Sequence, residues 1–215
     1  MSVICLQGGR ENTAGCAGLD AALLQIADRG AVTVIALADE DLRHNAAAAT
    51  LAERHFRGLG ATDLALVTDV EDSTALDAVR RARLVVIPGG SPRVLLAALR
   101  RSGLDEAIMQ ASAEGAVISG SSAGAMVLCR WTVQPGRPME VVPGIGLVED
   151  LVVLPHYAGG QDDWVSAVRA RLGDGVDLIG LPECSGVLLD GEALVAVGAD
   201  AATLITAEGP SRLAL

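Results

Sequence analysis

The chain has 215 residues, 51% hydrophobic and 20% charged, which is enough to bury one good core, so we expect residues 1–215 to form a single domain. A formal net charge of −11 and an aromatic content of 2% argue against a nucleic-acid partner, because the charge repels phosphates and few rings are present to stack on bases. All 16 basic residues are arginine, which excludes Schiff-base chemistry, a lysine general base, pyridoxal phosphate attachment and a P-loop.

The four cysteines, Cys5, Cys16, Cys129 and Cys184, form no CxxC pair and have no zinc-binding spacing. We therefore expect reduced, buried thiols, with no metal and no cofactor. The N-terminus does not resemble a signal peptide, and no apolar run reaches the ~18 residues of a membrane span. The sequence predicts a cytoplasmic protein with no membrane partner, and it leaves the oligomeric state open, a homodimer included.

Short β-branched runs recur in the first half of the chain, mostly about 30 residues apart as in βαβ units, at residues 3–6, 32–37, 64–67, 84–87 and 116–119. Amphipathic stretches between them predict helices. In residues 17–30, for example, Leu19, Leu23 and Ile26 share one face and Gly30 offers a C-terminal stop. Strands that are apolar on both faces need cover on both sides. We therefore expect a three-layer α/β sandwich with a mainly parallel sheet and helices on both faces.

Glycine and proline interrupt the apolar runs beyond residue 130. Residues 186–198, GVLLDGEALVAVG, place an Asp-Gly turn between two apolar runs. This arrangement predicts a C-terminal β-hairpin.

The last run of the first half leads into a turn rich in glycine and serine, within the sequence ISGSSAGAMV. The pattern G-x-S-x-G is met by Gly120, Ser122 and Gly124, so Ser122 is the residue that the turn exposes and Ser121 is its neighbour. Small flanking residues suit a strained turn in which strand and helix approach closely. The helix is expected to begin near Ala123, with its N–H aimed at developing negative charge. A tight turn with a capping serine would show the same pattern.

A catalytic serine needs a base, and the chain has three histidines. His44 and His55 lie in an expected surface helix, and we predict solvated surface for both. His156 follows the apolar run LVVLP, at the C-terminal end of a strand, where active sites of parallel sheets gather. His156 is therefore the predicted base, and a hydrogen-bonded structural histidine is the alternative.

The acid that orients the histidine can lie before or after it in the chain. Glu149 or Asp150 would give the order serine, acid, histidine of α/β-hydrolases, but would crowd acid and histidine into one short strand. Glu183 is better placed, at the end of the run VDLIGLPE, and Glu140 is a further rival. The inferred order is serine, histidine, glutamate.

With this order the chain resembles the peptidase E and cyanophycinase family of serine peptidases, whose fold is class I glutamine amidotransferase-like, of the flavodoxin-like type. The resemblance is carried in order by LQGGRENTAG, LVVIPGGSPRVLL, GSSAGA, LPHY and GLPECSG, of which GSSAGA with the preceding PGGS is the specific part. It implies that Ser122 is the nucleophile, His156 the general base and Glu183 the orienting acid. It also implies an oxyanion hole formed by the N–H groups of Gly90 and Ala123.

The resemblance further implies a small peptide substrate, cleaved at a peptide or isopeptide bond beside an aspartyl residue. A buried substrate carboxylate needs a guanidinium. Arg169 and Arg171 are the first candidates, and they point about 200° apart on a helix, so only one would face the site. Arg93 and Arg130 are rivals. Ser91 replaces the asparagine or aspartate of relatives after the glycine turn and is a further substrate-binding candidate.

Three other functions compete with the serine peptidase. A glutaminase would need cysteine at position 122, which is serine. A Rossmann nucleotide binder would rest on LQGGREN, which lacks G-x-G-x-x-G. The alternative that stays open is a catalytically inactive binding or regulatory protein of the same fold, which a covalent serine probe would distinguish from an enzyme.

Overall fold

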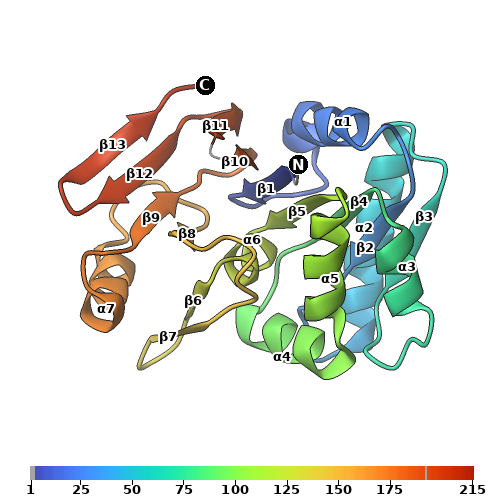
Figure 1. The fold of residues 1–215 in the computed structure, drawn as a ribbon, viewed down its shortest axis with the longest axis horizontal. Helices are drawn as coiled ribbons and strands as arrows, with labels where there is room; N and C mark the ends of the chain where they lie inside the picture. Colours follow the sequence, from blue (N-terminus) through green and yellow to red (C-terminus); the bar gives the residue numbers. More distant parts are fainter. Residues whose placement is uncertain (1–2, 192) are drawn as a thin grey trace.

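The structure of the protein is a computed structural model that describes residues 3–191 and 193–215. Within these residues a seven-stranded central sheet has the order β11-β10-β1-β5-β4-β2-β3 (Figure 1). Its parallel strands are β1 (Val3–Gln7), β2 (Val32–Ile35), β3 (Leu64–Val67), β4 (Leu84–Ile87) and β5 (Val117–Ser121). All the strands predicted in the first half therefore form, with bounds that differ by at most two residues.

The predicted hairpin extends the central sheet at the β1 edge. It consists of β10 (Ser185–Asp190) and β11 (Ala193–Gly198), both antiparallel to their neighbours. Glu192, which the sequence places between the two strands, lies outside the described residues. The predicted C-terminal hairpin is confirmed, although a further hairpin follows it in the chain.

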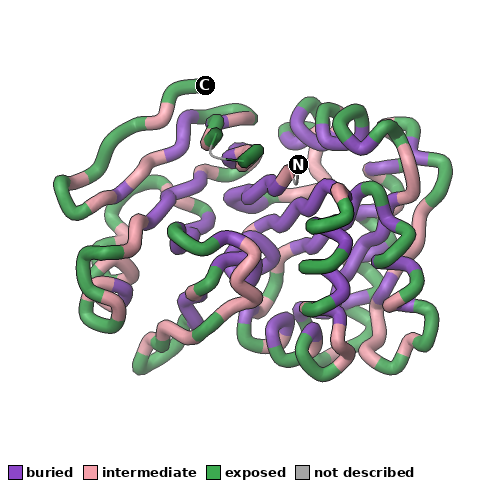
Figure 2. Tube along the Cα trace, viewed as in Figure 1, coloured by how far each residue is buried: buried purple, intermediate pink, exposed green. Residues whose placement is uncertain are grey.

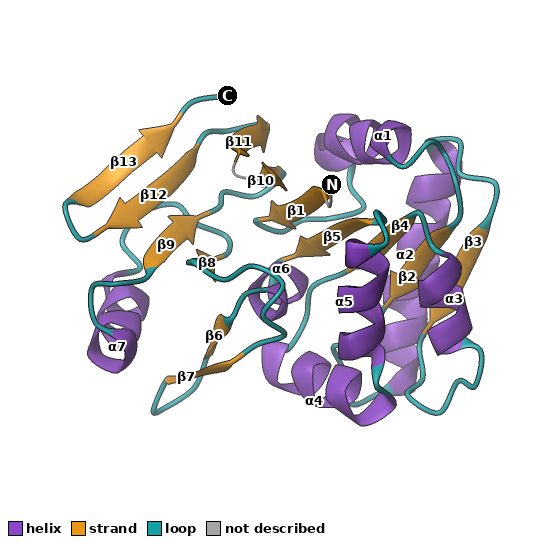
Figure 3. Ribbon diagram, in the orientation of Figure 1, coloured by secondary structure: helices purple, strands orange, loops and turns teal. Residues whose placement is uncertain are grey.

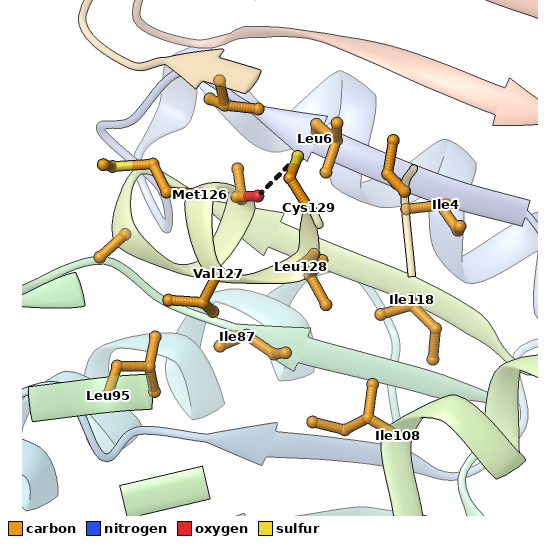
Figure 4. Packing of buried hydrophobic residues seen from close by; sticks show 14 of the residues in the cluster. Ile4, Leu6, Ile87, Leu95, Ile108, Ile118, Met126, Val127, Leu128 and Cys129 are labelled. Atoms are coloured by element: carbon orange, nitrogen blue, oxygen red, sulfur yellow. Dashed lines mark hydrogen bonds between the residues drawn. The ribbon is translucent and has the colours of Figure 1, made fainter. Parts of the chain in front are cut away.

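Helices cover both faces of the central sheet, as predicted (Figure 3). Leu23 and Phe56 from the helices of one face pack with Val34 of β2 in one hydrophobic cluster. Ile108 from the opposite layer packs with Ile118 of β5 in another (Figure 4). The first layer contains α1 (Ala17–Ile26), preceded by the short helix η1 (Ala14–Cys16), and α2 (Leu42–Gly58); the second contains α3 (Ala75–Arg81), α4 (Pro92–Ser102), α5 (Leu104–Ala113) and α6 (Ala123–Leu128).

A smaller four-stranded sheet, in the order β13-β12-β9-β8, was not predicted. It lies beside the C-terminal hairpin, and a two-stranded ribbon, β6 with β7, lies below it in Figure 1. Val153 and Ile179 of this sheet belong to the same hydrophobic cluster as Ile118, so the two sheets share a core (Figure 2). The elements are β6 (Trp131–Gln134), β7 (Glu140–Pro143), β8 (Leu151–Leu154), α7 (Asp162–Leu172), β9 (Asp177–Gly180), β12 (Ala202–Thr206) and β13 (Gly209–Leu213).

Helix α1 differs from the prediction in its buried face and its end. Ile26 is 43% exposed, whereas Leu24 is fully buried, because α1 packs against α2 as well as the sheet and its buried face is rotated accordingly. After the helix the chain turns through Asp28 and Arg29, both with positive φ, and not at Gly30. Among the described residues no helix combines the length and hydropathy needed to cross a membrane.

Candidate active site

Ser122 lies at a sharp turn between β5 and α6, with φ 50° and ψ −115°. The turn is tight enough to require glycine on both sides. A Cβ on Gly120 would lie 2.5 Å from the carbonyl carbon of Gly124, and a Cβ on Gly124 would overlap the carbonyl oxygen of Ile87. The helix begins at Ala123, as predicted. The local sequence therefore explains why a serine is held in a conformation that non-glycine residues rarely adopt.

The side chains of Ser122, His156 and Glu183 form a continuous chain of contacts. Ser122 Oγ lies 3.0 Å from His156 Nε2, and His156 Nδ1 lies 3.3 Å from Glu183 Oε1. A carboxylate oxygen can only accept, so the proton of the neutral imidazole lies on Nδ1, and the lone pair of Nε2 is directed at the serine hydroxyl. The imidazole and the carboxylate are about half exposed, so a ligand can reach them.

The loop after β1 connects the three segments that carry these side chains. Three successive carbonyl groups in this loop each accept one backbone hydrogen bond. The bonds run from Ser122 N to Gln7 O at 3.0 Å, from His156 N to Gly8 O at 2.7 Å and from Cys184 N to Gly9 O at 3.0 Å. All three donor residues have φ between 50° and 54°, a conformation that costs of order 1 kcal/mol or more for each of them.

Gly9 also packs directly against the imidazole of His156. A Cβ on Gly9 would overlap Cε1 of the ring and would lie 2.7 Å from Nδ1 and 2.9 Å from Nε2. Gly9 has φ +127°, a conformation that favours glycine. The position of the ring therefore depends on the absence of a side chain at residue 9.

The backbone N–H groups around Ser122 differ in whether a hydrogen bond occupies them. Within residues 3–191 and 193–215 no hydrogen bond occupies the N–H of Gly90 or of Ala123. The neighbouring N–H groups are occupied, because Gly89 N donates to Glu11 Oε1 at 2.6 Å and Ser91 N donates to the carbonyl of Ala38 at 2.9 Å. The two predicted oxyanion-hole donors are thus free in the described part of the chain.

Comparison with known proteins places this chain in a family. The family model of peptidase family S51 matches residues 30–199, most of the chain. The chain belongs to peptidase family S51. The S51 protein is a serine-type peptidase, and the family resemblance found in the sequence is confirmed.

Solved structures agree with the fold of this S51 peptidase. A peptidase from an acI-B1 Actinobacterium is 19% identical with a TM-score of 0.82, covering 100% of this chain and 94% of that chain. A putative peptidase E protein from Listeria monocytogenes EGD-e is 17% identical with a TM-score of 0.71, covering 93% and 100%. These likenesses confirm the peptidase E-like α/β fold.

One curated protein shares a shorter stretch with the S51 peptidase. A probable cobyric acid synthase of Methanopyrus kandleri is 37% identical over 83 residues, which covers 36% of this chain. The chain spans only 17% of the length of that relative.

Two of the three rival acids, Glu140 and Glu149, have ion-pair partners elsewhere in the S51 peptidase, and Asp150 lines a hollow that does not include His156. Glu140 pairs with Arg93 at 3.0 Å, and Glu149 pairs with Arg130 at 2.8 Å. These pairs also occupy the two arginines that were rivals for binding a substrate carboxylate. Glu183 is thus the carboxylate found at the histidine.

The structure does not bring Arg169 or Arg171 to the serine, contrary to expectation. The guanidinium of Arg169 donates to the carbonyl oxygens of Val176 at 2.6 Å and Ile205 at 3.2 Å, and so connects α7 to the smaller sheet. Arg171 lies over the ring of Trp131, 5.8 Å from its centroid. Arg169 is thus used at the smaller sheet and Arg171 at the ribbon β6–β7, two features that the sequence pattern did not reveal.

Arg10 is a residue near the site that the sequence pattern did not single out. Its Nη1 lies 3.5 Å from Glu183 Oε2, and its side chain is 64% exposed. Its carbonyl oxygen accepts hydrogen bonds from Thr13 Oγ1 and Cys16 Sγ, which hold the backbone at φ 60°. The signal in the sequence was a charged pair, Arg10 and Glu11, directly after two glycines at the end of the first strand.

Ser91, the remaining substrate-binding candidate, caps α4. Its Oγ accepts a hydrogen bond from Val94 N at 3.3 Å. Ser91 also lines a hollow of about 490 Å³ together with Gly89, Gly90 and the exposed His44. Ser91 therefore lies next to the free N–H of Gly90, and its hydroxyl oxygen accepts a hydrogen bond from the helix.

The prediction of solvated surface is right for His44 and wrong for His55. The side chain of His55 is 9% exposed, and its Nε2 lies 2.8 Å from Oδ2 of Asp20, which is also buried. Asp20 Oδ1 accepts a further hydrogen bond from Gln7 Nε2 at 3.0 Å. Helix α2 packs on α1, so the face of α2 that carries His55 is an interface between helices and not solvent.

The cysteines of the S51 peptidase are free thiols, as predicted, and only Cys184 is partly exposed. Burial raises the pKa of Cys16 and of Cys129 to about 12, and it also raises the pKa of Cys5. These three thiols are therefore unreactive at neutral pH. The part of the chain that the structure describes contains no group of three His, Cys, Asp or Glu side chains arranged to hold a metal ion.

Proposed function

We propose that the protein hydrolyses a small peptide or isopeptide bond beside an aspartyl residue, through an acyl-enzyme on Ser122. The observation that carries the proposal is the chain of contacts from Ser122 Oγ to His156 Nε2 at 3.0 Å and from Nδ1 to Glu183 at 3.3 Å. Both distances are within the reach of a serine, its base and the group that orients the base.

Each group has a defined role in the proposed reaction. Ser122 Oγ attacks the carbonyl carbon while His156 Nε2 takes its proton, and Glu183 stabilises the resulting imidazolium. The N–H groups of Gly90 and Ala123 bind the oxyanion. The amine then leaves with the proton of the imidazolium. A water molecule, deprotonated by His156, attacks the acyl ester, and the imidazolium returns this proton to Ser122 Oγ as the acid product leaves.

Arg10 is the cation that best supports a preference for an aspartyl residue. Its guanidinium lies beside the triad carboxylate, and the ion pair between them is long, at 3.5 Å, and exposed. A long, exposed ion pair contributes little energy, so a substrate carboxylate can replace Glu183 as its partner. We assign to Arg10 the role that the sequence pattern gave to Arg169 or Arg171.

The experiment begins with a fluorophosphonate probe and mass spectrometry of the adduct. Ser122 should carry the adduct, Ser122→Ala should abolish labelling and hydrolysis, and Ser121→Ala should retain most labelling. If Ser121→Ala prevents labelling and Ser122→Ala does not, the assignment of the nucleophile is wrong. The absence of both adduct and turnover in the wild type would favour the inactive binding protein.

Specificity is tested with short peptides carrying Asp, Glu, Asn or Ala before the scissile bond. The wild type should prefer Asp over Ala by ~100-fold or more, and Arg10→Ala should remove that preference. Arg171→Ala, which removes an exposed guanidinium stacked on Trp131, is the matched control and should keep it. Equal turnover of Asp and Ala peptides by the wild type would refute the aspartyl preference without contradicting the proposed hydrolase activity.

A further inference from the structure

The carboxylate of Glu11 joins two parts of the site that are far apart in sequence. Its Oε1 accepts a hydrogen bond from Gly89 N at 2.6 Å, and its Oε2 accepts one from Ser121 Oγ at 2.8 Å. The bond from Gly89 N is shorter than an ordinary N–H···O hydrogen bond, as expected when the acceptor is a charged carboxylate, and such charge-assisted bonds are the stronger kind. No ion pair of Glu11 is found within the described ranges, so the two hydrogen bonds are the polar contacts that hold its charge.

The partner of Oε1 belongs to the turn that carries the proposed oxyanion donor. The peptide between Gly89 and Gly90 has glycine on both sides, and such a peptide can flip at little cost. A flip would turn the Gly90 N–H away from the oxyanion and put a carbonyl oxygen in its place. Rapid catalysis therefore needs something that keeps this peptide in one orientation.

The peptides on either side of it are both held by hydrogen bonds. Gly89 N is held by Glu11, and Ser91 N is held by the carbonyl oxygen of Ala38 at 2.9 Å. No side chain at residue 89 can help, because a Cβ there would lie 2.9 Å from Glu11 Oε1 and 3.0 Å from Ser122 Cβ. Glu11 thus supplies the side-chain restraint on this turn and, through Ser121, ties it to the residue next to the nucleophile.

We propose that Glu11 is a positioning residue for the oxyanion hole. By binding Gly89 N and Ser121 Oγ together, it keeps the Gly89–Gly90 peptide oriented with its N–H towards the tetrahedral intermediate formed on Ser122. The proposal rests on the proposed serine-peptidase function, and it gives Glu11 no contact with the reacting atoms.

Three variants test the proposal, with Glu106→Gln, at an exposed position of α5, as the control. Glu11→Ala should lower kcat by ~100-fold or more, the loss found when one oxyanion donor is removed. Glu11→Gln should stay within about 10-fold of the wild type, because its Oε1 still accepts from Gly89 N and its amide can donate to Ser121 Oγ. Glu11→Asp keeps the charge but is one methylene shorter, so it should lose at least about 10-fold.

Two readouts separate positioning from a merely structural role. A peptide aldehyde, which forms a tetrahedral adduct with the serine, should bind Glu11→Ala more weakly by a factor similar to the loss in kcat. The intact peptide, measured by calorimetry in a Ser122→Ala background, should bind with a Kd changed by less than 3-fold when Glu11→Ala is added. If the alanine variant does not fold, Glu11→Asp is used for the same measurements.

The inference would be overturned if the wild type is active and Glu11→Ala changes its kcat and aldehyde affinity by less than 3-fold. That result would not affect the proposed roles of the triad. A loss of kcat accompanied by unchanged aldehyde affinity would also overturn it, because the oxyanion hole would then be intact. A wild type that neither labels at Ser122 nor hydrolyses peptides would overturn the proposed function as well.

Discussion

Replacing Gly9 by alanine should abolish most of the activity while leaving the protein folded. The new Cβ would overlap Cε1 of His156 and lie 2.7 Å from Nδ1, whereas unbonded heavy atoms pack at ~3.5 Å or more. The imidazole must therefore retreat by about 1 Å, and it can, because this side chain is half exposed. A displacement of that size breaks its alignment with Ser122 and should cost ~100-fold or more in kcat.

The stability cost of Gly9→Ala comes mainly from the backbone. Gly9 has φ +127°, and a non-glycine residue in such a region costs of order 1–3 kcal/mol. For a chain of this length that corresponds to a fall in Tm of roughly 2–4 °C for each kcal/mol. Gly209→Ala is the matched control, since Gly209 has φ +117° and a Cβ there would meet nothing within 4 Å.

The assay compares kcat, fluorophosphonate labelling rate and Tm for the wild type and both alanine variants. The two variants should lose similar stability, and only Gly9→Ala should lose activity. Gly9→Ala with kcat within 3-fold of the wild type would refute the reasoning. A much larger loss of stability than in Gly209→Ala would also refute it, because the clash would then be with the fold and not with a movable ring.

Two further predictions concern residues away from the serine. Arg169→Ala should lower the free energy of unfolding by ~2 kcal/mol, because the carbonyl oxygens of Val176 and Ile205 lose a charged donor. Its kcat/KM should stay unchanged, and denaturant titration and steady-state kinetics check both expectations. Altered peptide selectivity in this variant would restore Arg169 as a substrate-binding residue. Burial raises the pKa of the Cys129 thiol from 9.0 to about 12, so the folded state keeps its proton at pH values where the unfolded state loses it. The free energy of unfolding should therefore fall as the pH rises from 9 towards 12, by about 1.4 kcal/mol per pH unit for this group. Urea titrations at pH 8 and pH 10.5 should therefore show a smaller loss in Cys129→Ala than in the wild type, and equal losses would contradict a buried neutral thiol.

The central sheet and the serine turn could be predicted because their signals are local. Strands buried on both faces are continuous apolar runs, and the close approach of β5 and α6 requires glycine at fixed positions on either side of Ser122. The choice of Glu183 over earlier carboxylates followed from the order of elements along the chain. Its contact with His156 agrees with that choice.

Residues whose roles depend on distant contacts could not be predicted. Glu11 is defined by partners 78 and 110 residues away, and Arg10 by one 173 residues away. The burial of His55 depends on how two helices pack. Strands β8 and β9 appear in the sequence as the apolar runs before His156 and Glu183, but β13, Gly209–Leu213, is mostly exposed at the edge of its sheet and has no apolar alternation, so the separate sheet that these strands form could not be recognised.

The loop Gln7–Gly9 gives the fold a form of modularity. Since it fastens the segments of Ser122, His156 and Cys184 separately, the chain between them does not set their relative positions. The ribbon β6–β7 lies in the first of these connections and α7 in the second. Insertions in the ribbon and substitutions on the exposed face of α7 can therefore accumulate during evolution while the spacing of the reactive groups stays constant.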